Sequence, residues 1–121
     1  MAIKKVLVCD DSGPDRANLE RIVAGTGCTV ISAANGKEAL AKARAEKPDM
    51  IFLDILMPEM DGYETCRMLA NDPETKHIPV IFVTSKSARA DRVWAQMQGG
   101  KGYIAKPFQD KDVVAELQGA H

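Results

Sequence analysis

The stretch DMIFLDILMPEMDG, residues 49–62, decides the fold. Residues 50–53 form an uninterrupted apolar run of strand length, typical of a central parallel strand that helices cover on both faces. The run ends on a single carboxylate, Asp54, after which Pro58 and Gly62 turn the chain. Ligands of open α/β sheets bind outside the carboxyl ends of the strands, so Asp54 is a candidate site residue. On this stretch alone, a turn-capping role explains Asp54 equally well.

Further apolar runs of strand length alternate with helical segments along the rest of the chain. The other predicted strands are residues 6–9, 28–33, 80–83 and 103–105. Predicted helices begin near residues 12–14, 37, 63, 87 and 110. This alternation predicts an α/β fold: a doubly wound, five-stranded parallel sheet, (βα)5, in a flavodoxin-like three-layer sandwich.

The sequence predicts both the start and the inward face of the helix that follows residue 87. We expect Ser87 to cap its start, and Val93 and Met97 to face the core. Trp94 fits either core packing or a surface for a partner, because buried aromatic side chains often anchor interfaces.

Size and composition limit the classes of function. With 121 residues and a formal net charge of −1, we expect one domain, residues 1–121, without an output domain, and no nucleic acid as partner. Three widely spaced cysteines without a CxxC pair argue against a zinc site and fit reduced thiols. No apolar stretch of about 20 residues and no signal peptide is found, so we expect a cytoplasmic protein without membrane insertion.

Four of the five predicted strands end on groups suited to phosphate chemistry: Asp10 with Asp11, Asp54, Thr84 and Lys106. Because the strands are parallel, their carboxyl ends share one edge of the sheet, and these side chains should converge there. One polar residue at a strand end means little, since turns favour such residues. A carboxylate cluster, a hydroxyl and an ammonium together are harder to explain as turns.

The expected cluster is net negative and therefore favours a cation. Two carboxylates about 5 Å apart repel by roughly 3 kcal/mol at an effective dielectric constant of about 20. Oxygen ligands without His or Cys favour Mg²⁺ or Mn²⁺ over zinc. With such an ion present, Asp54 is the candidate nucleophile towards phosphorus. Lys106 would neutralise phosphoryl oxygens, and Thr84 would donate a hydrogen bond to one of them.

In these motifs the whole chain resembles the receiver domain of two-component response regulators, and in particular the single-domain, CheY-like members. The shared motifs are Asp10-Asp11, Asp54 with Met57-Pro58 and Gly62, Thr84-Ser85, and Tyr103 followed by Lys106-Pro107. The segment 91–99 is also similar to the PilH-like regulators of twitching motility.

The resemblance implies a signalling switch rather than a turnover enzyme, with autophosphorylation and autodephosphorylation at Asp54. Asp54 would accept a phosphoryl group from a phosphohistidine of a histidine kinase. Mg²⁺ would bind Asp11, Asp54 and the main-chain carbonyl of Leu56, while Asp10 would act through metal-bound water. Lys106 would contact the phosphoryl group.

The resemblance also implies a route from the site to a partner. The Lys106–Pro107 bond would be cis. On phosphorylation Thr84 would move inward and Tyr103 would change from an outward to an inward rotamer. This would remodel the face made by the fourth helix, fifth strand and fifth helix, where a separate effector would bind. Leu56 and Lys86 occupy positions that influence how fast the acyl phosphate hydrolyses.

Three alternatives remain open at this point. A small Mg²⁺-dependent phosphatase of the haloacid-dehalogenase type also uses an Asp nucleophile, but its first strand should end in DxD, whereas Asp10-Asp11 stands here. An FMN carrier of flavodoxin type would meet repulsion between its phosphate and the acidic strand ends. A degenerate receiver would never take phosphate. Within the switch hypothesis, the sequence does not separate an active signal from a phosphate sink that drains a shared kinase.

Overall fold

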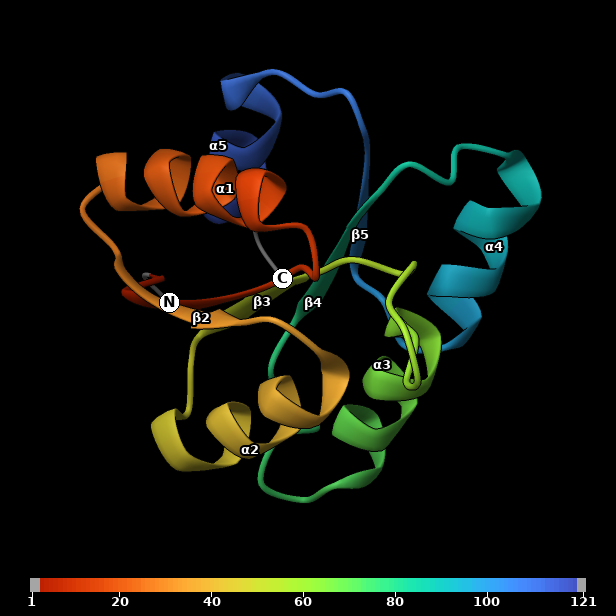
Figure 1. Cartoon of the computed structure of the whole chain (residues 1–121). Coiled ribbons are helices and arrows are strands. Elements are labelled where there is room, and N and C mark those ends of the chain that lie inside the picture. Colours follow the sequence, from red (N-terminus) through yellow and green to blue (C-terminus); the bar gives the residue numbers. More distant parts are fainter. Residues whose placement is uncertain (1–2, 120–121) are drawn as a thin grey trace.

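The computed structural model describes residues 3–119. Within this range five strands alternate with five helices (Figure 1). In chain order they are β1 (Lys5–Cys9), α1 (Gly13–Gly25), β2 (Thr29–Ala33), α2 (Gly36–Glu46), β3 (Met50–Leu53), α3 (Gly62–Asn71), β4 (Val80–Thr84), α4 (Arg89–Met97), β5 (Gly102–Ala105) and α5 (Asp110–Gln118). All strand pairs are parallel, in the order β2-β1-β3-β4-β5. The predicted doubly wound α/β sheet is confirmed.

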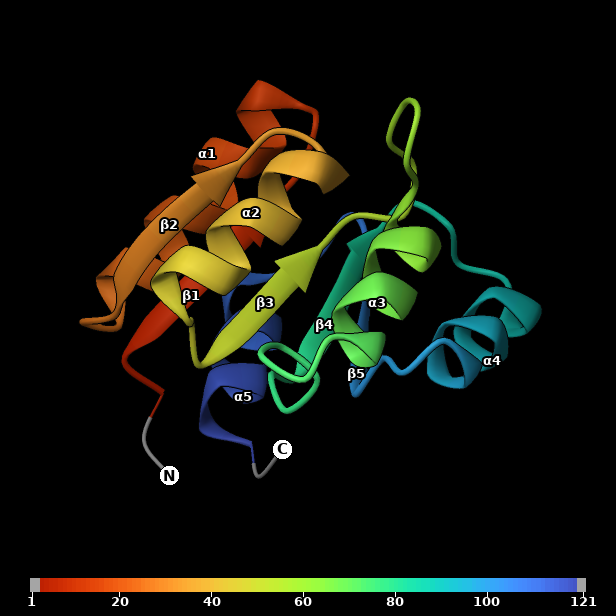
Figure 2. The same ribbon diagram turned by 90° about the horizontal axis from the view of Figure 1, so that it is seen from below.

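Helices cover both faces of the sheet, which gives three layers. Helices α1 and α5 lie on one face and α2, α3 and α4 on the other, as Figures 1 and 2 show. Successive residues of a strand point to opposite faces, so each central strand serves both cores. In β3, Ile51 and Leu53 pack towards α2 and α3, whereas Met50 and Phe52 pack towards α1 and α5. This double burial explains why residues 50–53 are apolar without alternation.

The strand order places a crevice next to β3. From β1 the chain crosses to β2 on one side of β1, and from β2 it returns to β3 on the other side. At such a reversal point the loops after the two strands separate, and ligands bind there in open α/β sheets. The loop after β1 begins at Asp10 and the loop after β3 begins at Asp54.

Side-chain caps fix three helices immediately beyond the carboxyl ends of strands. Ser12, Asn35 and Asp61 each accept a hydrogen bond from a backbone N–H in the first turn of α1, α2 and α3, respectively. Such caps satisfy donors that have no partner within the helix. Each helix start is thereby held at the edge of the sheet where the candidate site residues lie.

Helix α4 differs from its prediction. Its N-cap is Ala88 and it has no side-chain cap, so the expected cap at Ser87 is wrong. Val93 and Met97 are 50% and 69% exposed, so the expected inward orientation is also wrong. Ala95 is the buried residue of this helix. Small Ala95 lets α4 lie close to the sheet margin, while the larger apolar side chains remain in solvent.

Trp94 combines packing with exposure. Its ring makes an edge contact with Tyr63 of α3 at a centroid distance of 6.4 Å, yet the residue is 46% exposed. The contact with Tyr63 shows that part of the ring packs against α3, whereas a partner surface at Trp94 stays a prediction.

No helix within residues 3–119 combines the length and apolar character needed to cross a membrane.

Candidate functional site

Asp54 directly follows β3 and is buried. Its Oδ1 accepts hydrogen bonds from the backbone N–H groups of Ile55 (2.7 Å) and Leu56 (3.3 Å). The turn is held further by Gly62, whose N–H donates to the carbonyl of Ile55 (2.9 Å). These bonds fix the carboxylate and leave Oδ2 towards Lys106, whose Nζ lies 3.2 Å away.

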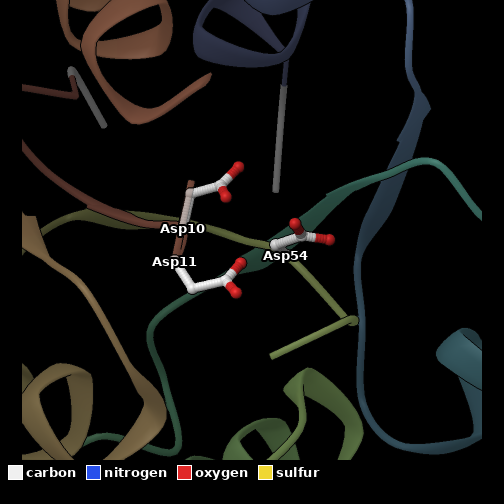
Figure 3. Close-up of side chains that lie close together, drawn as sticks. All are labelled: Asp10, Asp11 and Asp54. Atoms are coloured by element: carbon white, nitrogen blue, oxygen red, sulfur yellow. The ribbon is translucent and has the colours of Figure 1, made fainter. Parts of the chain in front are cut away.

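Three carboxylates converge at the crevice, as predicted. Oxygen atoms of Asp10, Asp11 and Asp54 lie within 4.8 Å of one another (Figure 3). Asp10 is fully buried, and its Oδ1 accepts a hydrogen bond from the N–H of Ser12 (2.9 Å). Asp11 is exposed and forms the solvent side of the cluster.

Lys106, which follows β5, is the cation at the centre of this cluster. Its Nζ lies 2.8 Å from Oδ2 of Asp10, 2.8 Å from Oδ2 of Asp15 and 3.2 Å from Oδ2 of Asp54. The Lys106–Pro107 peptide bond is cis, which confirms that prediction.

The pKa directions follow from burial and from these contacts. Burial raises the pKa of Asp10 above its ordinary value, although the hydrogen bonds from Lys106 and Ser12 oppose the rise. Burial alone would lower the pKa of Lys106, but its hydrogen bonds to Asp10 and Asp15 and the charge of Asp54 raise it instead. The ammonium therefore stays charged at neutral pH and compensates part of the negative charge.

The donor set fits a small divalent cation. Asp10, Asp11 and Asp54 offer only carboxylate oxygens, and the single ammonium of Lys106 is bound by Asp10 and Asp54. Mg²⁺ prefers such oxygen ligands and usually keeps several waters, which suits a cluster open to solvent at Asp11. The main-chain carbonyl of Leu56 stays a prediction as a further ligand.

Thr84 and Tyr103 both hydrogen-bond the backbone of Lys86, on the two peptide groups that flank this residue, rather than Asp54. The hydroxyl of Thr84 accepts a hydrogen bond from the N–H of Lys86 (3.3 Å), and the hydroxyl of Tyr103 donates to the carbonyl of Lys86 (2.6 Å). The ring of Tyr103 packs against Phe82 and lies beneath the guanidinium of Arg92, 4.9 Å from its centroid. The β4–α4 loop thus joins both predicted switch residues.

The two predicted lifetime residues line one depression beside the cluster. Leu56 and Lys86 border a hollow of about 460 Å³, together with Asp11 and Tyr63. Leu56 is 52% exposed. The Nζ of Lys86 lies 3.5 Å from Asp91 on α4, so the ammonium is paired on the helix side of the hollow.

Sequence reasoning missed two residues that contact the cluster. Asp15 binds Lys106, and Arg16 donates a hydrogen bond from Nη1 to the main-chain carbonyl of Asp10 (2.8 Å). The available signal was position: Asp15 lies four residues after Asp11, in the first turn of the helix that begins at this edge. An acid there projects back towards the strand end.

A family model described as the response regulator receiver domain matches residues 6–118. The chain belongs to this family. Receiver domains take phosphoryl groups from histidine kinases, act as signalling switches and generally bind Mg²⁺ at an acidic pocket. The phosphatase alternative is thereby disfavoured.

Relatives of this receiver domain agree with the assignment. Protein PilH from Pseudomonas aeruginosa is 38% identical over 113 residues, which are 93% of each chain. This supports the resemblance to PilH-like regulators. The chemotaxis protein CheY4 of Vibrio cholerae has a TM-score of 0.90 at 32% identity, covering 97% of this chain and 98% of that one.

A further structural neighbour bears on the metal. The receiver domain of a sensor histidine kinase from P. aeruginosa PAO1 has a TM-score of 0.88 at 26% identity and covers 97% of this chain and 96% of its own. That structure is described with a magnesium ion coordinated in its active-site cleft.

Proposed function

We propose that this receiver domain accepts a phosphoryl group on Asp54 from a phosphohistidine of a histidine kinase. One observation carries the proposal: Lys106 Nζ lies 3.2 Å from Oδ2 of Asp54, and carboxylate oxygens of Asp10 and Asp11 lie within 4.8 Å of those of Asp54. A nucleophile, a cation for the transferred group and a metal-binding cluster thus share one crevice.

In the proposed step, a carboxylate oxygen of Asp54 attacks phosphorus and forms an acyl phosphate. The bond from phosphorus to the histidine nitrogen breaks, and its electron pair stays on the imidazole. Lys106 stabilises the equatorial phosphoryl oxygens by charge. Hydrolysis by water later returns the Asp54 carboxylate and inorganic phosphate, which is the autodephosphorylation of the same site.

Mg²⁺, or Mn²⁺, is the proposed cofactor. Asp11 and Asp54 would bind it directly, Asp10 would act mainly through a water ligand, and the Leu56 carbonyl would complete the protein ligands. When bound, the ion neutralises charge on the carboxylates and on the phosphoryl oxygens. The relative with magnesium in its cleft supports this choice.

Thr84 and Tyr103 are proposed to transmit the conformational change from the phosphorylation site to the surface. A phosphoryl group on Asp54 would attract the Thr84 hydroxyl, which now accepts from the N–H of Lys86, and so shift the residue whose carbonyl Tyr103 binds. Tyr103 lines two depressions on the α4–β5–α5 face, of about 450 and 290 Å³. A separate effector would bind this face.

Leu56 and Lys86 are proposed to set the lifetime of the acyl phosphate. The apolar side chain of Leu56 cannot orient an attacking water by hydrogen bonding. Lys86 would reach the phosphoryl group only after leaving Asp91.

A cytoplasmic location is also part of the proposal, and the free cysteines Cys9, Cys28 and Cys66 fit it.

The proposal is tested by intact mass after incubation with Mg²⁺ and acetyl phosphate. The wild-type chain is expected to gain at most one phosphoryl group, and Asp54→Asn none. Asp110→Asn is the matched control, because it makes the same chemical change at an exposed carboxylate paired with Arg21. A phosphorylated Asp54→Asn chain, or sustained hydrolysis of a phosphomonoester by the wild type, would contradict the assignment.

Binding of a partner protein distinguishes an active signal from a phosphate sink. Capture of proteins from a lysate by the chain with beryllofluoride, but not without it, supports an active signal. Loss of phosphate from a shared kinase without such capture supports the sink.

A further inference from the structure

Asp15 reaches the crevice from the first turn of α1. Ser12 caps this helix by accepting a hydrogen bond from the N–H of Asp15 (3.4 Å). The neighbouring Arg16 binds the main-chain carbonyl of Asp10 (2.8 Å). These contacts fix the turn against the end of β1, and Oδ2 of Asp15 lies 2.8 Å from Nζ of Lys106.

The ammonium of Lys106 has no hydrogen left to donate. An ammonium carries three donors, and the carboxylates of Asp10, Asp15 and Asp54 lie 2.8, 2.8 and 3.2 Å from the nitrogen. A phosphoryl group on Asp54 takes over the donor that the Asp54 carboxylate held. Lys106 can turn a second donor to that group only if Asp10 or Asp15 releases it.

The three carboxylates differ in how readily they can be released. Asp10 is fully buried, so losing Lys106 would leave a buried charge without its cation. Asp54 carries the phosphoryl group itself. The side chain of Asp15 is 49% exposed, so water can replace Lys106 at its carboxylate. Asp15 is the partner that gives way most easily.

Resting on the function proposed above, we infer that Asp15 is a positioning residue that competes with the phosphoryl group for the ammonium of Lys106. Asp15 also holds Lys106 in place, and this positioning would strengthen the binding of a phosphoryl group. Asp10 and Asp54 hold the same nitrogen without Asp15, so competition outweighs the loss of positioning. The carboxylate of Asp15 therefore lowers the affinity of the site for a phosphoryl group and disfavours phosphorylation.

The inference is tested by binding of beryllofluoride, a non-covalent phosphoryl mimic, to the full chain at saturating Mg²⁺ by calorimetry. Asp15→Asn is expected to bind about three- to tenfold more tightly than wild type, because a half-exposed ion pair no longer competes. Asp15→Glu, which keeps the charge, is expected to return towards wild-type affinity.

A matched control separates this effect from a general loss of negative charge. Glu38 occupies in α2 the same third helical position that Asp15 occupies in α1, and its partner is Lys42 at 2.9 Å. Glu38→Gln is expected to leave the affinity unchanged. In a Lys106→Met background, Asp15→Asn is expected to have no further effect, since the shared partner is gone.

A second readout needs neither metal nor mimic. In the metal-free chain, ¹⁵N NMR of the Lys106 ammonium is expected to show faster exchange of its hydrogens with water in Asp15→Asn than in wild type.

Failure of this inference can be distinguished from failure of the proposed function. Unchanged or weaker binding by Asp15→Asn, or a gain that persists with Lys106→Met, would overturn this inference while leaving Asp54 as the acceptor. A wild-type chain that binds no beryllofluoride would overturn the proposed function and this inference together.

Discussion

Burial decides how the carboxylates of the cluster differ at the scale of single residues. Asp10 and Asp11 are adjacent in sequence, yet Asp10 is fully buried and Asp11 is exposed. Asp10 depends on Lys106 and on the N–H of Ser12 for compensation, whereas water solvates Asp11. The charge of such a buried carboxylate carries a desolvation cost. Asp10 therefore lowers the free energy of unfolding of the metal-free chain.

Asp10→Asn is therefore expected to stabilise the metal-free chain at pH 7, by about 1–2 kcal/mol in the free energy of unfolding. The folded state raises the pKa of Asp10, mainly through burial. Its contribution to stability is full below the unfolded pKa and is lost as pH rises through the folded pKa. The gap between variant and wild type should thus widen from pH 4 to pH 7, as measured by urea denaturation. A gap that narrows over this range would contradict the assigned cause.

At the scale of elements, contacts at both edges of the sheet hold β3 in place. The start of α3 packs on the end of β3: a Cβ on Gly62 would lie 2.7 Å from the Cα of Ile55 and would also meet the Asp54 carbonyl oxygen. At the opposite edge of the sheet, Oδ2 of Asp49 accepts hydrogen bonds from the N–H groups of Lys4 (2.9 Å) and Lys5 (3.0 Å), which ties β1 to β3.

Gly62→Ala is expected to destabilise the chain by about 1–3 kcal/mol, because backbone atoms must move to admit the methyl group. The shift displaces Asp54, so phosphorylation by acetyl phosphate should slow as well. Gly25→Ala, at the end of α1, is the control: its Cβ would meet nothing within 4 Å. That variant should be neutral or slightly stabilising. Equal unfolding free energies for the two variants, measured in urea, would contradict the close approach.

Asp49→Asn is expected to lower the unfolding free energy by about 1 kcal/mol at pH 7, because a neutral amide accepts the two N–H bonds less strongly. The bonds from Lys4 and Lys5 hold the pKa of Asp49 below its ordinary value. Stability from a lowered pKa is present above the unfolded pKa and is lost as pH falls through the folded one. Denaturant titrations should show the difference shrinking below about pH 4. A difference independent of pH would assign the loss to packing instead.

At the scale of the whole molecule, the proposed metal binding would be linked to folding. The carboxylates come from the ends of β1 and β3, so the metal site exists only when the sheet is assembled. A ligand that binds only the folded state stabilises it by mass action.

Mg²⁺ at about 100 times its dissociation constant is expected to raise the unfolding free energy of the wild type by about 2.7 kcal/mol. Removal with EDTA should reverse the gain. Asp11→Asn should lose most of it, whereas Asp110→Asn should keep it. Thermal unfolding at fixed ionic strength measures the effect, and equal stabilisation of both variants would show that the ion acts elsewhere.

The sequence by itself determined the sheet and the residues at its carboxyl edge. Apolar runs at residues 6–9, 50–53 and 80–83 that alternate with helical segments predict a parallel sheet covered on both faces, and parallel strands deliver Asp10, Asp54 and Thr84 to one edge. This prediction needs only local sequence, because each apolar run and the polar residue at its end are contiguous.

Only the tertiary structure decided which side chains are partners. Asp15 and Lys106 lie 91 residues apart, and nothing in either neighbourhood specifies their pairing. The exposure of Val93 and Met97 likewise depends on how little of the sheet α4 covers. Side-chain contacts between distant elements follow from the packing distance and rotation of those elements, and residue spacing along one element does not contain that information.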